Sequence, residues 1–79
     1  MDDKLRETVE KYHISLRHET DGVFALSDDP HDSGQYIFAV NSIPHLKDVY
    51  NGDAARLDIF SAAEKLAAEQ QQEKLEAVM

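Results

Sequence analysis

The hydrophobic positions at the start of the chain have the spacing of a helix up to His13 and the spacing of a strand after it. The first set recurs at i, i+4 and i+7, which places its members on one helical face: Leu5, Val9 and Tyr12. Asp2 or Asp3 can cap the start of this helix. From residue 14 to residue 19, apolar and polar positions alternate, as in a strand with one solvent-exposed face. The pattern therefore predicts an N-terminal helix followed directly by a first strand.

Two further strands are separated by turn-forming residues. Residues 20–22 form a tight-turn signal, because Gly22 can adopt the positive φ that a hairpin needs. Residues 23–27 then supply a second strand, which the acidic loop of residues 28–34 ends. Residues 36–40 are all apolar and therefore indicate a central strand that is covered on both faces. We expect the three strands to form a simple meander.

The segment after the third strand has two interpretations. Ser42 before Ile43 and Pro44 resembles a helix start, and Asn51-Gly52 would end that helix in a left-handed cap. The helical face would consist of Ile43, Leu46, Val49 and Tyr50. The Asn-Gly pair is also a hairpin signal, and alternating residues after it would then form a fourth strand from Arg56 to Phe60. We favour the helix.

The C-terminal part of the chain has a strong helical composition. The run from Ser61 to Glu64 fits a capping box, in which the serine and glutamate side chains satisfy free backbone amides at a helix start. Good helix formers continue to Met79, and the last turns are expected to project from the core. The chain is thus predicted to be one α+β domain over residues 1–79. Its small antiparallel sheet has three strands, or four if Arg56 to Phe60 is a strand, and packs against the N-terminal and C-terminal helices.

The composition narrows the kinds of chemistry that the chain can perform. It has no cysteine, which excludes disulfides and zinc-thiolate sites. No nucleophile elbow of the Gly-x-Ser-x-Gly type is present, and the three glycines do not form a phosphate-binding loop. The loop of residues 28–34 combines three carboxylates with His31, but it lacks the spacing of a calcium loop and reads more simply as a solvated turn. We therefore expect no enzyme activity, no metal and no cofactor. A small metal-dependent enzyme centred on His31 is the less favoured alternative.

The charge of the chain indicates the kind of partner that it can bind. Sixteen acidic residues against eight basic ones give a net charge of −8, which repels nucleic acid and anionic membranes and attracts a basic protein. The first ten residues are polar and acidic, and no apolar run is long enough to cross a bilayer, so we expect a cytoplasmic location. Between His13 and Val40 a single basic residue, Arg17, accompanies five acidic ones. These five are the predicted partner-binding residues: Glu19, Asp21, Asp28, Asp29 and Asp32.

Two functional hypotheses follow. In size, charge and lack of catalytic motifs the chain is similar in type to phage-encoded inhibitors of host defence, such as anti-CRISPR proteins, and to some antitoxins. It would then inhibit a nucleic-acid-handling complex by placing carboxylates in a basic channel in place of phosphate. The alternative is an oligomerisation or adaptor module, a homodimer for example. It would pair through the apolar positions of the C-terminal helix: Ala63, Leu66, Ala67, Leu75 and Val78.

Overall fold

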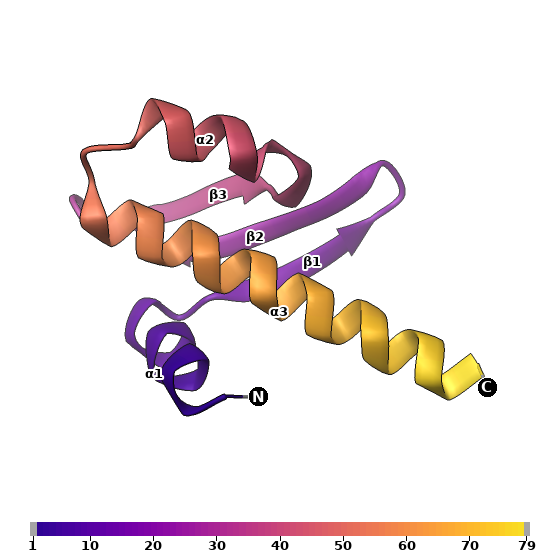
Figure 1. Cartoon of the computed structure of the whole chain (residues 1–79). Coiled ribbons are helices and arrows are strands. Elements are labelled where there is room, and N and C mark those ends of the chain that lie inside the picture. The colour runs from indigo at the N-terminus through magenta and orange to yellow at the C-terminus, as the bar shows by residue number, and fades with distance from the viewer. Residues whose placement is uncertain (1, 79) are drawn as a thin grey trace.

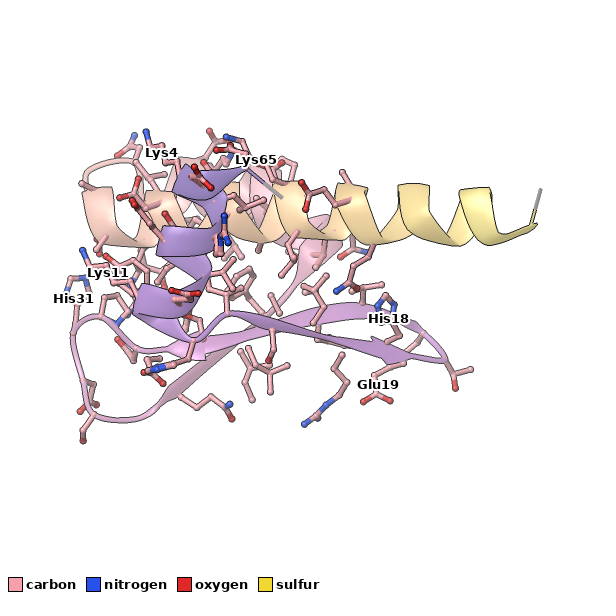
Figure 2. All side chains as sticks on the ribbon, turned by 90° about the horizontal axis from the view of Figure 1, so that it is seen from below. Lys4, Lys11, His18, Glu19, His31 and Lys65 are labelled. Atoms are coloured by element: carbon pink, nitrogen blue, oxygen red, sulfur yellow. The ribbon has the colours of Figure 1, made fainter. Side chains whose placement is uncertain are left out.

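The chain folds into two layers, with the helices on one face of a small sheet (Figures 1 and 2). The computed structural model describes the backbone of residues 2–78 and the side chains of residues 2–70. In this part of the chain the elements are α1 (Asp3–Tyr12), β1 (Ser15–Glu19), β2 (Gly22–Asp28), β3 (Gln35–Ala39), a 3-10 turn (Val40–Ser42), α2 (Ile43–Val49) and α3 (Ala54–Val78). The predicted α+β class with a three-stranded antiparallel sheet is therefore confirmed.

The sheet is a meander in the order β1-β2-β3, as expected from its two local turns. Leu16 pairs with Ala25, and Ala25 pairs with Phe38, so these three side chains share the face beneath the helices. Gly22, with φ of 150°, is the first residue of β2 and follows the turn from β1, where a residue with a side chain would be strained.

The prediction that residues 36–40 form a central, doubly covered strand was wrong. β3 is an edge strand, and β2 lies between its two neighbours. Only one face of β3 packs into the core, where Phe38 is buried. On the other face Ile37 is 54% exposed. Apolar residues on both faces of β3 thus reflect a solvent-exposed apolar surface and not a second covering layer.

Helix α1 begins and ends with the caps that its sequence allows. The Asp2 side chain accepts a hydrogen bond from the backbone N–H of Lys4 at 3.0 Å, which confirms the predicted N-cap. At the other end His13 takes the left-handed conformation, with φ of 52° and ψ of 49°. The next backbone N–H, that of Ile14, donates to the Val9 carbonyl at 2.9 Å. This cap turns the chain from α1 directly into β1.

Helix α2 forms where predicted, but the left-handed cap expected at Asn51-Gly52 was wrong, because the helix ends at Tyr50 with φ of −106° and neither Asn51 nor Gly52 has a positive φ. Helix α3 starts earlier than predicted. It begins at Ala54 and not at the capping box of residues 61–64. Asp53 caps it, because its side chain accepts from the backbone N–H of Arg56 at 3.1 Å. The alternative of a fourth strand from Arg56 to Phe60 was therefore wrong, since these residues are helical. The reason is tertiary: only a helix places Ile59, Phe60 and the alanines one turn later together against the sheet.

The core lies between α3 and the sheet and is centred on Phe60. This side chain is fully buried, and its ring meets those of Phe38 at 5.2 Å and Tyr50 at 5.8 Å between centroids. The other buried core residues come from every layer of the molecule: Leu5, Ile14, Ala25, Ile43, Ile59, Ala62, Ala63 and Leu66. Beyond this core the last turns of α3 extend past the sheet, as expected (Figure 1). Among the helices described, none has both the length and the apolar character needed to cross a membrane.

Candidate functional site

The five predicted partner-binding carboxylates lie at two opposite ends of the sheet. Glu19 and Asp21 border the turn between β1 and β2, whereas Asp28, Asp29 and Asp32 lie at the other end of β2. The seven residues of β2 separate the two groups by about 20 Å at roughly 3.3 Å per residue. Figure 2 shows this separation, with Glu19 at one end of the sheet and His31 of the second loop at the other. The structure therefore does not bring the five side chains into a single cluster.

Three of these five carboxylates already have a cationic or histidine partner within the protein. Glu19 lies 3.6 Å from Arg17, and Asp28 lies beside His13, in both cases with largely exposed side chains. Exposed pairs of this kind contribute little to stability and leave the carboxylates accessible to a partner. Asp29 differs, because it contacts Arg56 at 3.1 Å with only 20% of its side chain exposed. Asp29 is thus a structural residue, and the accessible carboxylates are those of Glu19, Asp21, Asp28 and Asp32.

Arg56 is the centre of a polar cluster that fixes the loop between β2 and β3 to the start of α3. Its side chain is 12% exposed and contacts the carboxylates of Asp29 at 3.1 Å and Asp53 at 3.5 Å. The guanidinium also lies over the rings of Tyr36 and Tyr50, at 4.3 and 4.9 Å from the ring centroids. Burial raises the pKa of the Tyr36 hydroxyl. The guanidinium is therefore held by two anions and two aromatic faces, which explains how it is accommodated at so low an exposure.

His31 adds a second link between the same loop and α3. Its Nε2 atom lies at hydrogen-bond distance from the carboxylate of Asp53, and its backbone N–H donates to Asp29 at 2.9 Å. The backbone N–H of Arg56 and the His31 side chain together lower the pKa of the Asp53 carboxyl. His31 therefore anchors the loop to α3, because its hydrogen-bond partner Asp53 caps that helix. Within the described residues, no group of three or more histidine and carboxylate side chains is arranged to hold a metal ion.

The sheet face opposite the helices, here called the open face, carries an apolar centre. No described element covers it, and its side chains point away from the helical layer in Figure 2. Leu26 pairs with Ile37 across β2 and β3, and Phe24 is the next residue on the same face of β2. Leu26 is 9% exposed, yet it lies outside the main core because it points to this other side. Together Phe24, Leu26 and Ile37 form an apolar strip along the middle of the open face.

Charged side chains border this strip at both ends. By strand alternation, Glu19 and Asp28 point to the same side of the sheet as Leu26, and they lie at opposite ends of β2. Arg17 pairs with Phe24 across the strands and forms the ion pair with Glu19. The arrangement is an apolar centre with carboxylates at each end. An apolar centre with a charged rim is the usual composition of protein interfaces.

The open face and the Arg56 cluster were not identified from the sequence. The signal for the open face was present in the apolar run of residues 36–40, which indicates either a second covering layer or an exposed patch. The Arg56 cluster had no local signal, because it joins residues 27 positions apart. Comparison of the chain with protein-family models, with curated proteins and with solved structures finds no match.

Proposed function

We propose that this chain is a non-enzymatic binding protein whose open face docks on a larger protein with a basic surface. One observation carries this proposal: on an uncovered sheet face, exposed Ile37 and half-buried Phe24 lie beside buried Leu26, between the carboxylates of Glu19 and Asp28. Protein interfaces commonly have an apolar centre with a polar rim, and the centre supplies most of the affinity. The partner chemistry that fits is therefore an apolar patch flanked on both sides by lysine or arginine.

The charge of the whole chain supports the same partner. A net charge of −8 accelerates encounter with a basic surface and opposes binding to acidic ones. A nucleic-acid-handling complex, with its Lys- and Arg-rich channels, is a partner of this chemistry, and we retain inhibition of such a complex as the finer form of the proposal. The carboxylates would then bind at two positions about 20 Å apart, one at each end of β2. A single dense patch imitating phosphates is not needed.

The alternative of a homodimer through the C-terminal helix has less support. Ala63 and Leu66, two of the residues proposed to form its contact, are buried in the core of the domain itself. Ala67 is partly buried, and Leu75 and Val78 lie outside the residues whose side chains are described. The described part of α3 thus uses its apolar stripe to cover the sheet.

The test compares two lysine substitutions at similarly exposed apolar positions on different surfaces of the molecule. Ile37→Lys places a charge in the apolar strip, while Val49→Lys is the matched control, because Val49 is 58% exposed on α2 and Ile37 is 54% exposed on the open face. The wild-type chain and Val49→Lys are expected to capture the same proteins from a native extract. Ile37→Lys is expected not to capture them. Each captured protein is expected to present a basic surface and to dissociate when salt rises from about 50 mM to several hundred mM, because screening shortens the Debye length.

Two outcomes would contradict the proposal. If Ile37→Lys retains the same partners with the same affinity as Val49→Lys, the open face is not the docking surface. If the captured partner is acidic at its contact, or binds equally at low and high salt, the charge complementarity is absent. Circular dichroism of both variants establishes that each remains folded.

A further inference from the structure

A groove of about 330 Å³ lies between α1 and α3, in the helical layer and away from the open face. Its apolar walls come from Leu5 and Ala62, which are both 4% exposed, and Thr8 and Ser61 also line it. Its volume is at the lower end of the range of small-molecule sites. The groove is separate from the surface assigned to the partner above, so any ligand that it holds is additional to that function.

Two lysines line this groove, and their electrostatic situation differs from that of the other basic residues. Across residues 2–70, each of the remaining lysine and arginine side chains has a carboxylate or an aromatic partner: Arg6 with Asp3, Lys11 with Tyr12, Arg17 with Glu19, Lys47 with Glu64, and Arg56 with Asp29 and Asp53. Lys4 and Lys65 have no such partner among these described residues, and both line the groove. In Figure 2 both are found on the helical side of the molecule, away from the sheet.

Two lysines without an ion-pair partner among the described residues therefore line one groove, in a chain of net charge −8. The lining includes one acidic residue, Asp58, and no ion pair joins it to either lysine in the part of the chain that the structure describes. They come from helices that are far apart in the sequence, and both line the groove. An anion in the groove would be attracted to both lysines and would form charge-assisted hydrogen bonds to them.

We propose that the groove between α1 and α3 binds a small aliphatic carboxylate. The ammonium groups of Lys4 and Lys65 hold the carboxylate, and the Ser61 hydroxyl donates a further hydrogen bond. Thr8 is not that donor, because its hydroxyl already donates to the Lys4 carbonyl at 3.1 Å. The short apolar part of the ligand packs on Leu5 and Ala62.

Asp58 sets the charge that the groove accepts. Asp58 also lines the groove, so the lining residues carry two positive charges and one negative charge. The net charge of one is balanced by a monoanion, whereas a dianion such as phosphate at pH 7.5 would add repulsion from Asp58. The expected order of affinity is therefore a monocarboxylate first, inorganic phosphate second, and a neutral molecule of the same size last.

The experiment titrates the isotope-labelled full chain with butyrate and follows backbone amide shifts by NMR. Saturable shifts at Lys4, Thr8, Ser61 and Lys65, with a Kd in the low millimolar range, are expected, and 1-butanol should bind at least about tenfold more weakly. Lys65→Gln should weaken butyrate binding by about tenfold, which corresponds to about 1.4 kcal/mol. The matched control is Lys11→Gln, which removes the same charge from an exposed helical position outside the groove and should leave the Kd unchanged.

Three results would overturn the proposal. The first is the absence of saturable shifts up to about 50 mM butyrate. The second is an equal Kd for Lys65→Gln and Lys11→Gln, which would assign the binding to general charge and not to the groove. The third is a tighter Kd for phosphate than for butyrate, which would contradict the role given to Asp58. Because the amide spectrum itself reports the fold, an unfolded variant is recognised at once, and Lys4→Gln then replaces it in the same comparison.

Discussion

Replacing Asp29 by asparagine tests whether this acidic residue serves the fold, as the structure indicates, and not a partner. The carboxylate accepts from the Arg56 guanidinium at 3.1 Å and from the backbone N–H of His31 at 2.9 Å. Asparagine keeps an oxygen acceptor of nearly the same shape but removes the charge. The control is Asp32→Asn in the same loop, which changes the net charge equally at an exposed side chain without an ion pair among the described residues.

The expected loss follows from the burial of the pair. Hydrogen bonds to charged groups contribute about 1.5–3 kcal/mol, and a neutral acceptor is roughly half as strong. Arg56 is 12% exposed and keeps the second carboxylate of Asp53 at 3.5 Å, which limits the damage. Asp29→Asn should therefore lower the free energy of unfolding by about 1–2 kcal/mol. In a domain of this size each kcal/mol corresponds to about 4–8 °C in Tm.

Urea and thermal unfolding, followed by circular dichroism at pH 7, measure both variants against the wild type. Asp32→Asn should lie within about 0.5 kcal/mol of the wild type, as is usual for surface substitutions. If Asp29→Asn is as stable as Asp32→Asn, the ion pair with Arg56 does not hold the loop. Asp29 would then return to the set of carboxylates that are available for a partner.

Two further substitutions probe the core and the helix cap. Phe60→Ala should lower the free energy of unfolding by about 3–5 kcal/mol, because the ring is fully buried among three other aromatic rings. A loss below about 1 kcal/mol in urea unfolding would show that the core is arranged differently. The lowered pKa of Asp53 means that its stabilising contribution is complete above the ordinary carboxyl value near 3.8 and is lost as the pH falls through the folded-state pKa. Asp53→Asn should accordingly be less stable than the wild type at pH 7, and it should lose less stability than the wild type between pH 5 and pH 3. Parallel profiles of stability against pH for the two proteins would refute this role of the Asp53 carboxylate.

Most elements of the fold could be predicted from the sequence because their signals are local. The meander follows from alternating residues interrupted by two turns, and the cap at Asp2 needs only its own helix. The start of α3 could not be predicted in the same way. The local capping signal at Ser61 is satisfied by a helix that passes through it, and the true start at Ala54 depends on burying Ile59 and Phe60 against the sheet. Tertiary packing thus outweighed a local motif.

The candidate site was predictable in composition but not in arrangement. The acidic residues could be identified from charge alone, whereas their separation into two ends depends on β2 lying between them. Two ion pairs join positions that are 15 and 27 residues apart: Asp28 with His13, and Asp29 with Arg56. No sequence spacing predicts pairs of this kind. The apolar strip of the open face could not be predicted for a different reason. An apolar run has the same sequence pattern whether a layer of protein covers it or not.

The large share of the core that α3 supplies has a consequence for folding. Five core residues, from Ile59 to Leu66, belong to this helix. A nascent chain that has emerged only as far as β3 has both faces of its sheet exposed, and a lone small sheet of this kind lacks the burial needed for independent stability. The sheet and α3 therefore fold together, because the sheet is covered only when α3 packs on it.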